Sequence, residues 1–334
     1  MKDKLLSLNN LHVKFFNEDG IVNAVNGVNL DIESGQSIGI VGESGCGKSV
    51  TSFSILQLLP PLGKITEGEI NYRKENGEVI NLGNLDPESK EIRKIRGAEI
   101  SMIFQEPLSA FSPVHTVGNQ IAETVILHQN MKKNAARQVT IDLLKKVGIS
   151  KPEQRIDEYP FQLSGGMRQR AMIAMALACN PRLLIADEPT TALDVTIQAQ
   201  VLYLIKDIQE KMDLSLMLIT HDLGVIAHMV EFVYVMYLGE VVEYGPVREI
   251  FKEAKHPYTR DLLNSIPKAS GTKGELAYIK GTVPSATNIP KGCPYHTRCS
   301  DIIGKVCKET IPEVIKTNAN HGVKCLLYSQ EEVK

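Results

Sequence analysis

The residues best suited to chemistry form the glycine-rich run GESGCGKS at positions 42–49. An apolar β-branched segment precedes this run and a helix-compatible segment follows it, which is the strand–loop–helix setting of a phosphate-binding loop. Its glycines let backbone N–H groups form a concave nest for phosphate oxygens, and the next helix presents its positive N-terminal end to the same anion. Lys48 supplies a charge for the β- and γ-phosphates, and the Ser49 hydroxyl is placed to bind Mg²⁺. The spacing predicts a nucleotide site with ATP as its ligand.

Two acids close an apolar segment further along the chain. Asp187 and Glu188 follow the run LLIA at residues 183–186, which predicts a buried strand whose carboxyl end lies beside the phosphate loop. Asp187 is then placed to hold Mg²⁺ directly or through water. Glu188, one residue further, would face the γ-phosphate and accept a proton from the attacking water.

A second helix start suited to anions lies between these two motifs. Ser164, Gly165 and Gly166 open a helix expected from Met167 to Ala178, and a serine before such a start caps free N–H groups. One acidic pair with two anion sites suggests that the second site serves the nucleotide of a partner chain.

The remaining pattern predicts the elements that position these motifs. Alternating apolar residues near Val13 and a strand-like stretch at residues 25–32 predict an antiparallel ribbon before the loop. Residues 73–94 carry few apolar side chains and favour an exposed excursion, whereas residues 117–182 are rich in helix formers. Strands at residues 183–186 and 216–219 alternate with helical segments, which indicates a mostly parallel α/β sheet.

Composition bounds the function. The chain has 334 residues, 43% hydrophobic and 23% charged, with a net charge of −2. This charge gives no reason to expect nucleic acid or an anionic membrane as a partner. No apolar run is long enough to span a bilayer, and no secretory signal is apparent. We expect a cytosolic chain whose six cysteines are reduced thiols or metal ligands.

Taken in order, these motifs resemble the ATPase subunit of an ATP-binding cassette (ABC) transporter over about residues 5–255. The loop at residues 42–49 resembles Walker A, residues 163–167 the ABC signature and residues 183–188 Walker B. Gln105 stands at the position of the Q-loop glutamine, residues 192–194 at the D-loop, and His221 at the switch histidine.

The resemblance implies a P-loop NTPase cassette of the α/β class, with a mixed sheet core, an antiparallel β ribbon and a helical subdomain at about residues 115–182, all within residues 1–255. It also implies a head-to-tail dimer in which the signature residues Ser164, Gly165 and Gly166 complete the partner's pocket. The catalytic residues implied are Glu188, His221 and Gln105. The nucleotide contacts implied in the same chain are Phe15, with Phe16 as the alternative adenine-stacking ring, and Ser44, Gly45, Cys46, Gly47, Lys48, Ser49 and Val50. The Mg²⁺ ligands implied are Ser49, Gln105 and Asp187.

Residues 256–334 differ in character, because they are irregular and rich in proline and cysteine. We expect them to form a small appended domain that needs a cross-link for its stability. The cysteines concerned are Cys293, Cys299, Cys307 and Cys325. Their spacing lacks the C-x-x-C pairs common around structural zinc, and a [4Fe–4S] cluster, Zn²⁺, and unligated or disulfide-bonded cysteines all remain open. Residues 256–260 and 292–299 resemble the C-terminal extension of oligopeptide/dipeptide importer ATPases. Members of that group can carry an iron–sulfur cluster on four such cysteines, so the resemblance favours the cluster.

The expected function is therefore that of an ATPase bound peripherally at the cytoplasmic face of the cell membrane, where it energises import of di- or oligopeptides. The expected partners are a second ATPase subunit, identical or paralogous, two integral membrane permease subunits and, indirectly, an extracytoplasmic peptide-binding protein. Import of nickel or another small solute is the alternative within this class. A soluble ABC ATPase acting on DNA or ribosomes and a P-loop kinase are the alternatives outside it.

Overall fold

The first part of the chain forms an antiparallel ribbon that becomes a small sheet. The computed structural model describes residues 3–191, 193–266 and 279–329. Four antiparallel strands are ordered β2-β1-β4-β5. Their bounds are β1 (Lys4–Asn17), β2 (Gly20–Glu33), β4 (Gly63–Arg73) and β5 (Val79–Asn81). The expected ribbon is confirmed by the pairing of β1 with β2, which is interrupted by several register shifts.

The main sheet has eight strands within the described residues, in the order β11-β12-β10-β9-β3-β8-β7-β6. The strands from β9 to β6 are parallel, and β10, β12 and β11 extend the sheet in antiparallel fashion. This is the mixed sheet that the sequence predicts. The strand bounds are β3 (Ser37–Val41), β6 (Ile100–Ile103), β7 (Leu183–Asp187), β8 (Ser215–Ile219), β9 (Phe232–Tyr237), β10 (Glu240–Pro246), β11 (Ile315–Lys316) and β12 (Gly322–Val323).

The parallel strands are buried on both faces. In β7, Leu183 and Ile185 belong to a core shared with the ribbon, whereas Leu184 and Ala186 belong to a core shared with the helices. Alternate residues of a strand point to opposite faces, so a strand covered on both sides reads as a continuous apolar run. The parallel strands that precede the motifs therefore show little alternation of apolar and polar residues.

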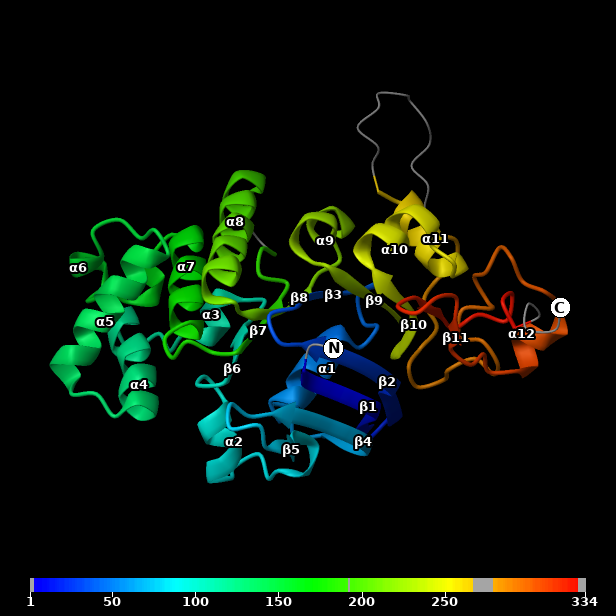
Figure 1. The fold of residues 1–334 in the computed structure, drawn as a ribbon, viewed down its shortest axis with the longest axis horizontal. Helices are drawn as coiled ribbons and strands as arrows, with labels where there is room; N and C mark the ends of the chain where they lie inside the picture. Colours follow the sequence, from blue (N-terminus) through cyan, green and yellow to red (C-terminus); the bar gives the residue numbers. More distant parts are fainter. Residues whose placement is uncertain (1–2, 192, 267–278, 330–334) are drawn as a thin grey trace.

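Helices cover one face of this sheet and extend beyond its β6 edge. Figure 1 shows α4, α5 and α6 at one end of the molecule, with α7 and α8 between them and the sheet. The α-helix bounds are α1 (Lys48–Ile55), α2 (Lys90–Ile95), α3 (Pro107–Ala110), α4 (Val117–Gln129), α5 (Lys133–Lys146), α6 (Pro152–Arg155), α7 (Gly165–Ala176), α8 (Val195–Met212), α9 (Leu223–Met229), α10 (Val247–Glu253), α11 (Pro257–Asn264) and α12 (Lys305–Glu309). Short 3₁₀ turns occur at Leu82–Asn84 and Pro160–Gln162.

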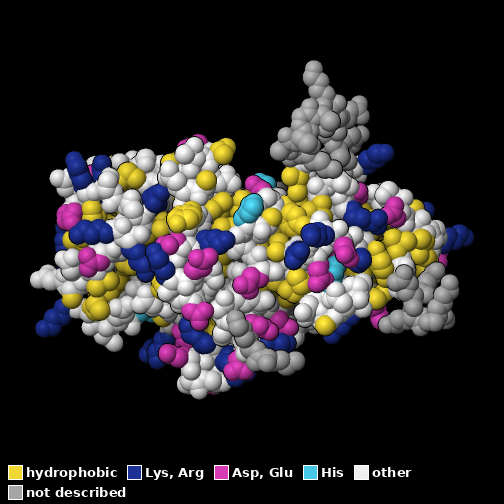
Figure 2. Space-filling view, turned by 45° about the horizontal axis from the view of Figure 1, so that its top comes forward, with side chains coloured by type: hydrophobic (Ala, Val, Ile, Leu, Met, Phe, Trp, Pro, Cys, Tyr) yellow, Lys and Arg dark blue, Asp and Glu magenta, His cyan; other side chains and the backbone are white. Residues whose placement is uncertain are grey.

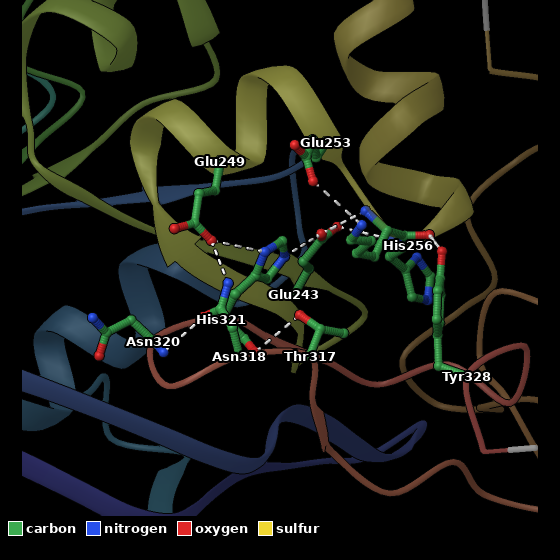
Figure 3. A network of polar contacts seen from close by, with 10 residues as sticks. Glu243, Glu249, Glu253, His256, Thr317, Asn318, Asn320, His321 and Tyr328 are labelled. Atoms are coloured by element: carbon green, nitrogen blue, oxygen red, sulfur yellow. Dashed lines mark hydrogen bonds and ion pairs between the residues drawn. The ribbon is translucent and has the colours of Figure 1, made fainter. Parts of the chain in front are cut away.

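The C-terminal region lies at the opposite end from α4–α6 and joins the cassette's own sheet and core (Figure 1). Strand β12 pairs with β10, and Tyr258 and Tyr295 belong to the same buried cluster as the helix side of the sheet. Figure 3 shows a polar junction at the same place. There the buried Glu243 carboxylate accepts hydrogen bonds from the backbone N–H groups of Lys255 and His256, at 2.6 and 2.9 Å. The ring of His321 lies 2.8 Å from the same carboxylate.

The surface carries both signs of charge. On the face drawn in Figure 2, basic and acidic side chains are interspersed. Across the described ranges, no helix combines the length and apolar character needed to cross a bilayer.

Candidate nucleotide site

The phosphate loop joins the buried strand β3 to helix α1, as its sequence predicts. Gly42, Gly45 and Gly47 have φ values of 153°, 80° and 98°, a region that side chains with a Cβ rarely adopt. A Cβ on Gly47 would also collide with the carbonyl oxygen of Ala24, and one on Gly42 with that of Met236. The loop's shape therefore requires glycine at both positions.

The loop lines a pocket of about 260 Å³. The Lys48 ammonium group lies beneath the loop and donates to the carbonyl oxygens of Gly42 and Glu43, at 2.8 and 3.0 Å. Residues from the ribbon, from the Q-loop position, from the acidic motif after β7 and from the C-terminal region share the pocket. Its lining residues are Val22, Ala24, Ser44, Gly45, Gly47, Lys48, Ser49, Val50, Gln105, Glu188 and Ala286. A larger and more apolar pocket of about 540 Å³ between α5, α7 and α8 contains none of the motif residues.

Cys46 belongs to the loop but does not line this pocket. Its side chain is 1% exposed, and its sulfur lies 3.9 Å from the Lys48 nitrogen. Burial raises the pKa of the Cys46 thiol. A thiol buried in this way is a poor source of reactive thiolate.

Asp187 ends strand β7 beside the loop and is 2% exposed. Its Oδ1 atom is buried without a hydrogen-bond partner. Burial raises the pKa of Asp187, against the opposing effects of the Ser49 hydroxyl and the Lys48 charge. An unpaired buried carboxylate oxygen next to a serine hydroxyl fits a hard cation such as Mg²⁺, which prefers oxygen ligands.

Glu188 lies where three predicted catalytic residues meet. The Gln105 amide donates to Glu188 Oε2 at 3.0 Å, and His221 Nδ1 lies 3.2 Å from Oε1. The Thr191 hydroxyl donates to Oε2 at 2.9 Å, a contact that the sequence interpretation missed. Burial opposes ionisation of Glu188, but the hydrogen bonds from His221 and Thr191 outweigh it and lower the carboxyl pKa. The carboxylate is therefore ionised and oriented at neutral pH.

The signature residues lie elsewhere. Ser164 caps α7, accepting a hydrogen bond from the Met167 N–H at 3.3 Å. Ser164, Gly165 and Gly166 are absent from the lining of the chain's own pocket, and a Cβ on Gly165 would meet nothing within 4 Å. The helix start is thus open on its outer side. In the D-loop, Asp194 caps α8, and Ala192 lies outside the described residues.

Phe15 does not line the pocket. It pairs across the ribbon with Val22, which does line it, and also with Gly63 on the opposite neighbour β4. A Cβ on Gly63 would lie 2.8 Å from the Phe15 ring, so the ring covers that glycine. Phe16 is 43% exposed and is also absent from the pocket lining. Adenine stacking by either ring remains an untested prediction.

The C-terminal cysteines lie near one another and are free thiols. Burial, together with the neighbouring C-terminal thiols, raises the pKa of Cys293 and of Cys299 to about 11 each. The Cys293 N–H also donates to the Cys307 carbonyl at 2.9 Å. Within the described ranges, no group of at least three His, Cys, Asp or Glu side chains is arranged to hold a metal ion.

The fold and this pocket define an ATP-binding cassette ATPase. The family model described as "ABC transporter" matches residues 25–191, and the model "Oligopeptide/dipeptide transporter, C-terminal region" matches residues 242–307. The dipeptide transport ATP-binding protein DppD of Bacillus subtilis (strain 168) is 49% identical over 329 residues, covering 98% of this chain and 96% of that protein. The oligopeptide transport ATP-binding protein AppD of the same strain is 49% identical over 328 residues, covering 98% of each. The chain belongs to the ABC transporter family, in the oligopeptide/dipeptide group of ATP-binding subunits.

A solved structure agrees with the cassette fold. The dimeric ATP-binding cassette MJ0796, in a post-hydrolysis state bound to ADP and Pi, superimposes with a TM-score of 0.64 at 31% identity. It covers 73% of this chain and 99% of its own. The expected family, cassette fold and ATPase class are thus confirmed.

Proposed function

We propose that this chain is the ATP-hydrolysing subunit that powers import of dipeptides or oligopeptides across the cytoplasmic membrane. The observation that carries the proposal is the extent of the match. MJ0796 covers 73% of the chain, whereas DppD covers 98%, and a peptide-transporter family model matches residues 242–307. The C-terminal region is therefore a feature shared with peptide-transport proteins.

In hydrolysis, Glu188 accepts the proton of the attacking water. Its lowered pKa keeps it ionised, and Gln105, Thr191 and His221 fix its orientation through hydrogen bonds. His221, whose side chain is 62% exposed, holds the γ-phosphate and the water in line. Such positioning is the main demand of phosphoryl transfer, because the reaction needs little covalent help.

Ser49, Asp187 and Gln105 would hold Mg²⁺, which would neutralise charge on the phosphates. The unpaired Asp187 Oδ1 supports this ligand set. The nest residues from Ser44 to Val50 hold the phosphates, while Lys48 leaves its two carbonyl partners to reach the β- and γ-phosphates.

Two cassettes close head to tail around the nucleotide, each offering Ser164, Gly165 and Gly166 to the partner's pocket. The open outer side of the α7 start supports this arrangement, as does the dimeric structure of MJ0796. The second cassette is an identical or a paralogous chain. Two integral membrane permease subunits, served by an extracytoplasmic peptide-binding protein, hold the pair at the cytoplasmic face of the membrane.

Cys293, Cys299, Cys307 and Cys325 would hold a [4Fe–4S] cluster, with Zn²⁺ as the alternative, in a structural role, although their side chains are not arranged as a metal site in the described structure. The support for this proposal is the mutual proximity of the four thiols, of which Cys307 and Cys325 are buried and Cys293 and Cys299 partly buried, since thiolates are the usual ligands of both centres. The test is iron, sulfide and zinc analysis after anaerobic purification. Iron and sulfide in equal amounts support the cluster, and one zinc per chain or a metal-free folded protein overturns it.

The transport role is tested by reconstituting the chain with its membrane subunits in liposomes. We expect peptide-loaded binding protein to stimulate phosphate release, and nickel-loaded binding protein to have no such effect. Stimulation by another solute would contradict peptide import while leaving the ATPase intact. Separately, Glu188→Gln should lower turnover by about a hundredfold or more and trap an ATP-dependent dimer. If this variant binds ATP but stays monomeric in the presence of every suitable companion cassette, the head-to-tail arrangement is refuted.

A further inference from the structure

A side chain that lies far beyond the phosphate loop in the sequence forms an ion pair with a residue of the loop. The Arg298 guanidinium donates to both carboxylate oxygens of Glu43, at 2.6 and 3.0 Å. Glu43 is a loop residue between Gly42 and Ser44, and Arg298 comes from the C-terminal region. The two-pronged geometry fixes direction as well as distance, because a planar guanidinium matches a carboxylate only in a narrow range of orientations.

This ion pair is sheltered from water on the arginine side. The Arg298 side chain is 3% exposed, and its guanidinium lies 5.8 Å from the ring centre of Tyr237 and 5.9 Å from that of Tyr295. A third ring acts on the loop backbone, since the Glu43 N–H donates to the Tyr258 hydroxyl at 2.9 Å. Both the side chain and the backbone of Glu43 are therefore held from the C-terminal side of the molecule.

A second segment of the C-terminal region reaches the nucleotide pocket directly. Ala286 lines the pocket together with the loop and with Val22 and Ala24 of β2. Its carbonyl oxygen accepts a hydrogen bond from the Asn23 N–H at 3.0 Å, which ties this segment to the ribbon. The C-terminal region thus contributes one wall of the pocket and one anchor of the loop.

Fixing Glu43 matters because its carbonyl oxygen is one of the two that hold Lys48 beneath the loop. The position of the Glu43 peptide thereby sets the start of the nest and one of the two contacts that Lys48 makes with the loop. A loop that is already shaped for phosphate loses less conformational entropy when nucleotide binds.

We propose that Arg298 is a positioning residue of the nucleotide site: by clamping Glu43 it preorganises the phosphate loop, so that the C-terminal region sets the affinity for nucleotide. The inference rests on the ATPase activity of the family and is independent of the transported solute and of the centre at the cysteines.

The test compares Arg298→Ala, Arg298→Lys and Glu43→Gln in the full chain, with Arg260→Ala as the matched control. Arg260 lies in the same region, but its 2.7 Å ion pair is with Asp301 and not with the phosphate loop. Dissociation constants for ATP and ADP are measured by titration calorimetry, with KM and kcat from phosphate release. Circular dichroism checks that each variant is folded.

We expect Arg298→Ala to weaken binding of both nucleotides by about tenfold, with KM rising more than kcat falls. Arg298→Lys should be intermediate, because lysine keeps the charge but cannot form the two-pronged contact. Arg260→Ala should leave nucleotide affinity within about twofold of the parent. Because both partners act through one contact, Arg298→Ala combined with Glu43→Gln should weaken binding no more than the stronger single change.

Three outcomes overturn the proposal. One is unchanged nucleotide affinity in Arg298→Ala and Glu43→Gln. Another is an equal loss in Arg260→Ala, which would mean that the region acts only through general stability. The third is a double variant whose losses multiply, since the two side chains would then act separately. If Arg298→Ala does not fold, the milder Glu43→Gln decides the matter by the same criteria.

Discussion

Replacing His256 with asparagine should remove a specific acid sensitivity from the folded chain. His256 is 1% exposed and caps helix α11, its Nδ1 atom accepting a hydrogen bond from the Tyr258 N–H at 3.1 Å. Burial lowers the pKa of the His256 ring to about 4, with Arg260 acting in the same direction and Glu243 against it. Protonation would also place a proton on the nitrogen that must accept the capping bond. Asparagine can still accept that bond but does not titrate.

The direction and size of the change in folding stability with pH follow from proton linkage. Unfolded, the ring binds a proton below its ordinary pKa of 6.5, whereas in the folded chain it does so only below about 4. Between these values the unfolded state holds more protons, so stability is full above pH 6.5 and falls as the pH is lowered towards 4. At about 1.36 kcal/mol for each pH unit of difference, the loss approaches 3 kcal/mol.

The assay is urea unfolding of parent and His256→Asn chains, followed by circular dichroism at pH values from about 4 to 7.5. The free energy of unfolding of the parent should fall more steeply with acid than that of the variant, by up to about 3 kcal/mol across the range. His115→Asn is the control, because His115 is exposed and its loss should leave the slope unchanged. Parallel curves for parent and His256→Asn would refute the reasoning, since the remaining titrating groups are common to both chains.

Three further predictions concern the nucleotide site. Asp187→Asn should raise the Mg²⁺ concentration for half-maximal ATPase by at least about tenfold, while ADP binding in EDTA stays within about twofold; equal losses in both would contradict a metal-holding role. Gly47→Ala should abolish nucleotide binding in calorimetry, because the added Cβ meets the Ala24 carbonyl at a φ of 98°, and a normal affinity would show that the loop can relax. Cys46 should react with iodoacetamide more slowly than Cys179 in peptide mapping, because burial raises the pKa of both thiols but only Cys46 is fully buried, and faster reaction at Cys46 would show that the loop opens.

The sequence predicts the local parts of this site well because their geometry is dictated locally. The loop glycines adopt the positive φ values that the nest requires, and Ser164 caps α7 at the expected place. Glu188, Gln105 and His221 come together because each follows a parallel strand, and the carboxyl ends of parallel strands share one edge of a sheet.

Register and sparse packing are harder to predict. The sequence places Phe15 near the pocket by its position on the first strand; in the structure Phe15 pairs with Val22, and β2 lines the pocket through Val22 and Ala24. Adenine stacking by Phe15 stays a prediction. Residues 73–94 were expected to be exposed. Most of this stretch is exposed or partly exposed, as expected, and Val79 is 53% exposed, but Leu82 and Ile92 are fully buried in the ribbon core. Isolated apolar residues of this kind pack without leaving a periodic pattern.

Contacts between distant segments leave the weakest trace in a single sequence. Glu43 and Arg298 are 255 residues apart, and neither has a local partner that would indicate the other. Strand β12 is only two residues long, too short to show alternation, yet it joins the C-terminal region to the main sheet. A boundary at residue 255 follows from composition and stays a prediction, whereas the buried tyrosines Tyr258 and Tyr295 pack within the cassette core. Because this packing orients Arg298 towards the loop, a cassette cut at that boundary would keep every nucleotide motif and lose the clamp on Glu43.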